Sequence, residues 1–180
     1  MVVDAQTEAV DRAIPGDIPF DLEAIFRAQY HRLTLVIARV VRDPARAEEL
    51  AVEVFLKLWR NPQAQGEMAE AWLYRTAVRR GLDELRRQTR RARFESLFRF
   101  VRPIPTPEEI GAATEEQDRV RSVIAGIAPR HAGLLLLTGQ EFSYAEMAST
   151  LDLNPASVGT LLIRARQAFR KEYIKRYGKQ

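Results

Sequence analysis

Two helix-start signals follow each other closely between Ser143 and Lys171. Ser143 and Glu146 have the spacing of a capping box, in which each side chain accepts a hydrogen bond from the other residue's backbone N–H group. Asn154 and Pro155 form the second signal, because asparagine is a good N-cap and proline a good first helical residue. Apolar residues continue at helical spacing after each signal. The segment is therefore predicted to be either a helix-turn-helix, whose second helix usually enters a DNA major groove, or an ordinary helical hairpin.

The rest of the chain is also predicted to be helical, with no strand-like alternation. Asp21 and the pair Asp43-Pro44 are expected to start two helices, and a long helix is expected from about residue 69 to 94. The prolines and acidic residues of 103–117 predict a linker. The expected fold is all-α, with two small helical domains joined by a Pro-rich acidic linker. Its boundaries are a disordered extension at 1–19, a domain at 20–102, the linker at 103–117 and a helix-turn-helix domain at 118–180.

Composition excludes several classes of function. The chain has no cysteine and only two histidines, which are far apart in the sequence, so no metal site and no cofactor is expected. No nucleophile–base pair stands out, so no catalytic residue and no small-molecule substrate is expected. The apolar runs are too short to cross a membrane and residues 1–19 lack the features of a signal peptide. The expected location is the cytoplasm.

Positive charge is concentrated in one segment. The net charge of the chain is +4, whereas residues 79–102 carry nine arginines against Asp83, Glu84 and Glu95. Just before this segment lie Trp72 and Tyr74. Guanidinium groups pair with phosphates and aromatic rings stack on unpaired bases, so this helix is predicted to bind nucleic acid with separated strands. An arginine-rich surface helix with a buried tryptophan would have the same composition.

Three stretches together resemble the extracytoplasmic-function (ECF) group of the sigma-70 family of RNA polymerase sigma factors. The resemblance covers about residues 20–175. It rests on AEELAVEVFLKLWR (47–60), on WLYRTAVRRGLDELRR (72–87), and on IAPRHAGLLLL (127–137) followed by FSYAEMASTLDLNPASVGTLLIRARQAFR (142–170). In that family, the first stretch docks on core RNA polymerase, the second opens the −10 promoter element, and the third reads the −35 element.

The resemblance implies a sigma factor that binds core RNA polymerase and promoter DNA, with an anti-sigma factor as a further partner. The polymerase-binding residues it implies are Glu48, Glu49, Glu53, Phe55, Lys57 and Trp59. The −10 residues it implies are Trp72, Tyr74, Arg75, Arg79, Arg80, Asp83, Arg86 and Arg87. The −35 residues it implies are Tyr144, Asn154, Ser157, Thr160, Arg164, Arg166 and Gln167.

Four positions depart from the family pattern. Arg79 stands where the family usually has asparagine, and arginine cannot accept a hydrogen bond from a base. Val52 replaces a usual glutamine, and Gly159 and Leu161 replace basic residues of the recognition helix. These departures keep a second interpretation open, in which the chain is a sigma-like decoy that binds an anti-sigma factor or polymerase with little promoter activity. A helix-turn-helix regulator that works without polymerase is a third.

Overall fold

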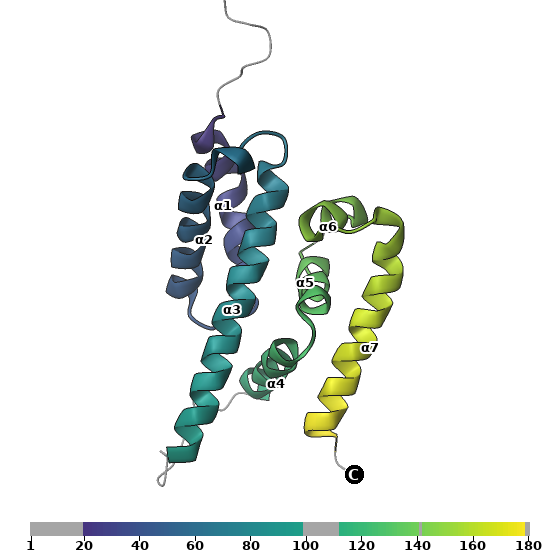
Figure 1. Ribbon diagram of the computed structural model, residues 1–180. Coiled ribbons are helices and arrows are strands. Elements are labelled where there is room, and N and C mark those ends of the chain that lie inside the picture. The colour runs from purple at the N-terminus through teal and green to yellow at the C-terminus, as the bar shows by residue number, and fades with distance from the viewer. Residues whose placement is uncertain (1–19, 99–111, 141, 179–180) are drawn as a thin grey trace, which may run out of the picture.

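The computed structural model describes residues 20–98, 112–140 and 142–178, and these residues form helices and no strand. Figure 1 shows α1, α2 and α3 side by side, with α4, α5 and α6 packed along one side of α3 and α7 beyond them, against α4 and α5. The α-helices are Leu22–Ala38 (α1), Pro44–Trp59 (α2), Ala69–Phe98 (α3), Ala112–Gly126 (α4), Pro129–Thr138 (α5), Tyr144–Leu151 (α6) and Val158–Tyr177 (α7). The all-α prediction is confirmed.

The predicted helix starts are present as hydrogen-bonded caps. Asp21 accepts from the backbone N–H of Ala24 at 2.9 Å, and Asp43 caps α2 in the same way. The capping box of Ser143 and Glu146 is formed in both directions, at 3.2 and 2.7 Å. Asn154 also caps, although a short 3-10 turn, Pro155–Ser157, comes between it and α7.

The N-terminal half, residues 20–98, is a three-helix bundle. Its core is built from the apolar stripes of α1, α2 and α3, with Leu33, Leu50 and Leu73 among the side chains that are almost fully buried. Gly81 lies at the crossing of α1 and α3, where an added Cβ atom would come within 3.1 Å of Val40. The small residue therefore allows these two helices to approach closely.

The C-terminal half, residues 112–178, surrounds the buried helix α5. Leu134 and Leu137 of α5 are inaccessible to solvent, and most of the side chains around this helix are apolar. Helices α6 and α7 form the helix-turn-helix, and Asp152 ends α6 in the left-handed region at φ 56°. Aspartate tolerates this conformation better than most residues.

The two halves, predicted as domains on a linker, share one continuous apolar core. A second apolar stripe of α3 makes this contact: Tyr74 packs edge-on against Phe142 at 4.7 Å between ring centroids, and Val78 lies close to Gly133 of α5. Arg32 adds polar contacts across the same junction. Its guanidinium lies 4.0 Å from the Phe142 ring centroid and 3.4 Å from the Glu146 carboxylate.

The linker is shorter at its C-terminal end than the sequence predicted. Residues 112–117 were expected to belong to it but form the first turns of α4. Small and acidic residues at the start of this segment are compatible with the first turn of a helix, where negative charge is stabilised by the helix dipole. The remainder of the predicted linker, 103–111, and the predicted disordered extension, 1–19, lie outside the described residues.

Candidate nucleic-acid interface

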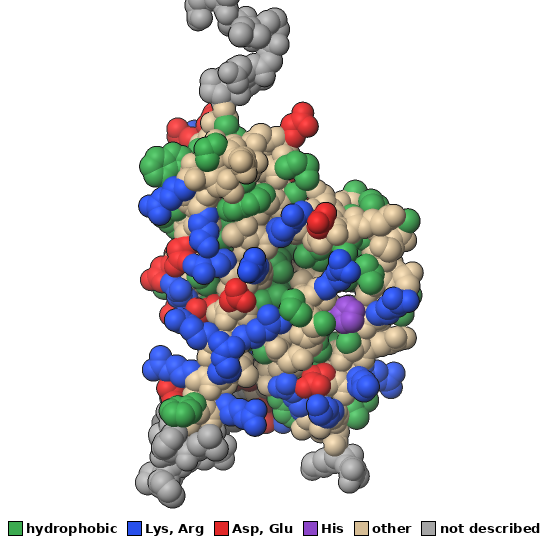
Figure 2. Space-filling view, in the orientation of Figure 1, with side chains coloured by type: hydrophobic (Ala, Val, Ile, Leu, Met, Phe, Trp, Pro, Cys, Tyr) green, Lys and Arg blue, Asp and Glu red, His purple; other side chains and the backbone are tan. Residues whose placement is uncertain are grey.

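One face of α3 carries Arg75, Arg79 and Arg86, which we call the arginine face. Asp83 lies between them, and all four residues border a cavity of about 340 Å³ together with Arg130 at the start of α5. Figure 2 shows Lys and Arg side chains running along α3 toward its lower end. The predicted −10 residues of this face are thus brought together, but the C-terminal half lies directly against them.

Arg75 is bonded to the end of α6. Its guanidinium donates hydrogen bonds to the backbone carbonyl oxygens of Ser149 and Thr150, at 2.9 and 2.8 Å. Carbonyl groups in the last turn of a helix have no partner within the helix and carry the negative end of its dipole. They therefore attract a guanidinium as a phosphate would, and Arg75 is engaged within the protein.

Two more arginines of the N-terminal half reach helix ends of the C-terminal half. Arg86 donates to the carbonyl oxygens of Ala125 and Ile127 at the end of α4, each at 3.4 Å. Arg39 donates to the carbonyl oxygen of Gly139, directly after α5. Arginines of the N-terminal half thus bind the carbonyl ends of α4, α5 and α6, and we call this packing of the two halves the closed arrangement.

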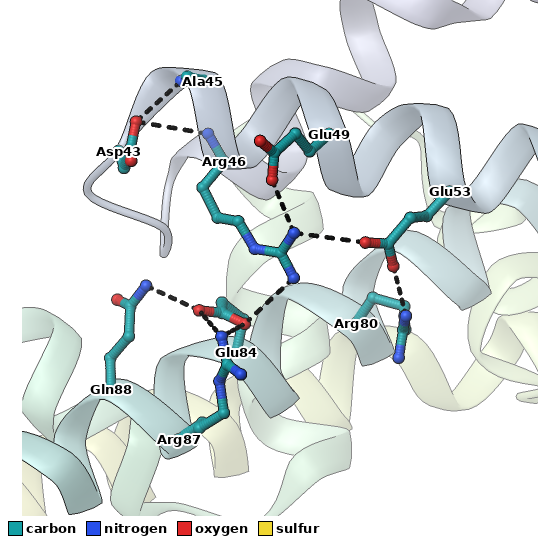
Figure 3. A network of polar contacts seen from close by, with 9 residues as sticks. All are labelled: Asp43, Ala45, Arg46, Glu49, Glu53, Arg80, Glu84, Arg87 and Gln88. Carbon is teal, nitrogen blue, oxygen red and sulfur yellow. Dashed lines mark hydrogen bonds and ion pairs between the residues drawn. The ribbon is translucent and has the colours of Figure 1, made fainter.

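Arg80 and Arg87 were predicted with the arginine face but lie on another side of α3. Figure 3 shows them in a network between α2 and α3, in which Arg80 pairs with Glu53 and Arg87 pairs with Glu84. Arg46 lies at the centre and contacts Glu49, Glu53 and Glu84 at 2.8, 3.3 and 3.7 Å. The network neutralises part of the arginine charge that the sequence assigned to DNA, and it joins α2 to α3.

The carboxylate of Glu84 is the buried member of this network, with its side chain 8 % exposed. Burial alone would raise its pKa, but hydrogen bonds from Arg87 and Gln88 and the charges of Arg87 and Arg46 outweigh burial, so the pKa is lowered. A carboxylate with a lowered folded-state pKa stabilises the fold above its unfolded-state pKa, and this stabilisation is lost as the pH falls through the folded-state value.

We therefore expect the wild-type protein to lose more stability than Glu84→Gln as the pH falls from about 5 to 3. The difference should be about 1.5–3 kcal/mol, the size of a charge-assisted hydrogen bond. Urea unfolding at a series of pH values measures it. Glu23→Gln is the control, because Glu23 is 71 % exposed and pairs with Arg27 of its own helix. An equal pH dependence in Glu84→Gln and the wild type would contradict the role of this carboxylate.

The two aromatic residues of the predicted −10 set differ in placement. Tyr74 was expected on the arginine side of α3, but its side chain is only 1 % exposed. Its hydroxyl donates to Gln29 Oε1 at 2.6 Å, and burial raises its pKa to about 12, so it stays a neutral donor. Packing against Phe142 explains the difference, because the apolar ring completes the second stripe of α3. Trp72 is half-buried and packs against the core.

The predicted polymerase-binding residues of α2 also separate into two groups. Glu48, Glu49, Lys57 and Trp59 are exposed, whereas Glu53 is half-buried in the network with Arg80 and Phe55 is 3 % exposed and belongs to the core. Sequence reasoning missed Leu56 as a surface residue and treated Val52 only as a departure. With Trp59 they form an exposed apolar stripe on α2, at 43, 40 and 58 % exposure. The sequence contained a sign of this stripe, because Leu56 interrupts the polar face of an otherwise amphipathic helix.

The predicted −35 residues lie around the start of α7. Asn154, Ser157, Thr160 and Arg164 border one shallow hollow of about 370 Å³, whose other lining includes Leu161. Gln167 is exposed and follows Arg164 at helical spacing. Arg166 is not in this group, because it borders a different cavity, against Arg39 and α4.

Tyr144 lies beside Gly159. The ring comes within 3.5 Å of the position that a Cβ atom would occupy at Gly159. The exposed tyrosine of α6 thus covers the glycine of the recognition helix, and Leu161, half-buried, packs against the core. The apolar character of Leu161 therefore has a local packing explanation, whereas a Cβ atom at position 159 would meet Tyr144 only at ordinary van der Waals distance.

The structure thus combines an all-α fold with the arginine face of α3, an exposed apolar stripe on α2 and a helix-turn-helix. Residues 25–91 match the family model described as Sigma-70 region 2. Over this segment the chain resembles the sigma-70 family, and the relatives given below are named as members of its extracytoplasmic-function group. Sigma factors are regulators of transcription initiation rather than catalysts.

Two relatives and one solved structure illustrate the similarity. The ECF RNA polymerase sigma factor SigK of Mycolicibacterium vanbaalenii is 24% identical over 177 residues, covering 94% of this chain and 90% of its own. SigL of Mycobacterium tuberculosis is 27% identical over 160 residues, covering 82% and 88%. The sigma factor RpoE of Bartonella quintana, solved in complex with the anti-sigma factor NepR, has a TM-score of 0.51 at 18% identity, covering 86% of this chain and 97% of its own. This last likeness concerns the fold. Among the described helices, none is long and apolar enough to cross a membrane.

Proposed function

We propose that the protein binds core RNA polymerase in the cytoplasm and directs it to a specific set of promoters. The match of residues 25–91 to sigma-70 region 2 carries the proposal, because α2 and α3 of that segment hold the exposed apolar stripe and the arginine face. In this proposal residues 20–102 dock on polymerase and engage the −10 element. Residues 118–180 read the −35 element through Thr160, Arg164 and Gln167.

The closed arrangement cannot be the promoter-bound one in this proposal. Arg75 and Arg86 would have to contact DNA phosphates, yet their guanidiniums are bonded to the carbonyl ends of α6 and α4. The same donors cannot serve both acceptors, so the halves separate before the arginine face meets DNA. RpoE was solved in complex with an anti-sigma factor. We propose that a protein of this kind binds the present chain while it is not bound to polymerase.

Run-off transcription with purified core polymerase and a pooled promoter library tests the proposal. We expect this protein to enrich transcripts that share two spaced upstream elements. A Leu56→Asp variant should lower polymerase affinity at least tenfold, because it puts a charge into an apolar contact that excludes water. Leu35→Asp, at an equally exposed apolar position of α1, is the control. No transcript above that of core polymerase alone, at saturating protein, would reject promoter direction.

The sigma-like decoy remains the second candidate. It is favoured by the closed arrangement and by the absence of basic side chains at Gly159 and Leu161, which leaves the recognition helix with fewer phosphate contacts. Polymerase binding without any promoter-dependent transcript would support it over the sigma factor. Equal duplex binding by the wild type and Arg164→Gln would also support it.

A further inference from the structure

The strongest concentration of arginines outside the arginine face lies in a cleft between the two halves. The cleft has a volume of about 650 Å³ and is bordered by five arginines against a single acidic residue, Asp118. The arginines are Arg42, Arg90, Arg93, Arg121 and Arg176. We call it the polyarginine cleft. None of these arginines belongs to the predicted DNA-binding or polymerase-binding sets.

Ion pairs compensate part of this charge, since Arg176 pairs with Glu172 and Asp118 serves two of the arginines. Arg42 and Arg121 share the one carboxylate of Asp118, at 2.8 and 3.6 Å. Arg121 Nε is buried without a hydrogen-bond partner. Arg90 has neither a hydrogen bond nor an ion pair within the described residues. Guanidinium groups gathered in this way repel one another unless an anion lies between them.

Other contacts hold the walls of the cleft in position. Arg176 donates to the carbonyl and the hydroxyl oxygens of Ser122 at 2.9 and 2.8 Å, and to Glu172 at 2.6 Å. The walls come from four places in the chain: the turn before α2, the second half of α3, α4 and the end of α7. The cleft therefore exists only while the halves are packed together.

We propose that the polyarginine cleft binds a small polyanion that carries several phosphate groups, and that this ligand stabilises the closed arrangement. Planar guanidiniums bind phosphate oxygens in pairs, and several of them around one cleft suit a chain of linked phosphates. A ligand that binds only one of two arrangements shifts the equilibrium toward it. The binding itself does not depend on the proposed function, although its effect on transcription does.

Calorimetric titration of the full-length protein with inorganic tripolyphosphate tests the binding. We expect one saturable site, about tenfold weaker in Arg90→Gln because a charge-assisted contact is lost. Arg91→Gln is the matched control, since it removes the same charge one residue further along α3, where Arg91 is 80 % exposed and pairs with Glu95. No saturable binding, or equal weakening in both variants, would overturn the site.

The coupling to the closed arrangement has a separate test. Phe142→Ala should weaken tripolyphosphate binding several-fold although Phe142 does not border the cleft. Wild-type affinity in a folded Phe142→Ala variant would overturn the coupling.

Adenosine triphosphate, titrated without divalent cations, distinguishes the sources of the phosphate chain: tighter binding than tripolyphosphate indicates a nucleotide, and equal binding indicates the phosphates alone. Because no polymerase is present, these results are independent of the run-off experiment.

Discussion

Replacing Phe142 with alanine is expected to change the equilibrium constant between the closed and an open arrangement about a hundredfold, in favour of the open one. Phe142 is 5 % exposed, and its ring contacts Tyr74 and the Arg32 guanidinium across the junction of the halves. Removing a buried phenylalanine costs about 3–5 kcal/mol. Because the contacts with Tyr74 and Arg32 exist only in the closed arrangement, we assign about 3 kcal/mol of the loss to it, which is about a factor of 100.

Small-angle X-ray scattering and DNA binding measure this shift. The radius of gyration should increase, and the affinity for a mixed-sequence single-stranded oligonucleotide should rise because Arg75 and Arg86 are released. Leu35→Ala, which shortens an exposed apolar side chain of α1, should change neither quantity. Circular dichroism must show that the Phe142→Ala variant keeps its helices. A folded variant with an unchanged radius and unchanged DNA affinity would show that Phe142 does not hold the halves together.

Local helix signals were the most predictable part of this protein. Asp21, Asp43, Ser143 and Asn154 all cap as expected, because a capping hydrogen bond involves only a few neighbouring residues and is encoded by them alone. The capping box is the clearest case, since both of its hydrogen bonds follow from the spacing of Ser143 and Glu146. The helix-turn-helix then follows from two such signals and the short connection between them.

The packing of the two halves was not predictable in the same way. Tyr74, Val78, Leu82 and Leu85 recur at helical spacing in the sequence, yet Tyr74 was assigned to the arginine side of α3. A helix with two apolar stripes has two buried faces, but the sequence does not say which element covers the second one. Gly133 shows the same limit, because its need to be small arises from Val78 and Leu151, which are distant in the sequence.

The roles of individual arginines were hidden for a related reason. The charge of residues 79–102 indicated a polyanion partner, but charge does not distinguish a phosphate from a carboxylate or a helix end. Arg80 and Arg87 face Glu53 and Glu84, and Arg86 faces the end of α4. Arg79 has no hydrogen bond or ion pair within the described residues. Arg79 is therefore the predicted −10 arginine whose charge is not compensated by a direct contact in the closed arrangement.

This difference between Arg79 and Arg86 predicts unequal effects on transcription. The change in binding free energy caused by a substitution is the interaction free energy lost in the DNA-bound state minus that lost in the free protein. Under the proposed function, Arg79→Gln loses a phosphate contact only in the bound state, so we expect promoter-dependent transcription to fall at least tenfold, as for one charge-assisted hydrogen bond of about 1.5–3 kcal/mol. Arg86→Gln also loses its bonds to Ala125 and Ile127 in the closed arrangement, so its net effect should be about threefold or less.

Run-off transcription with a promoter identified from the library, together with polymerase affinity, checks this order. Polymerase affinity should stay within about twofold in both variants, because neither side chain lies on the apolar stripe of α2. Arg27→Gln, which removes the same charge from an exposed position on α1, should leave transcription unchanged. In the Phe142→Ala background the free-state bonds of Arg86 are already broken, so the two substitutions should there become equally damaging. If Arg86→Gln were the more damaging in the wild-type background, or if the difference persisted in Phe142→Ala, the helix-end bonds of Arg86 would not compete with DNA.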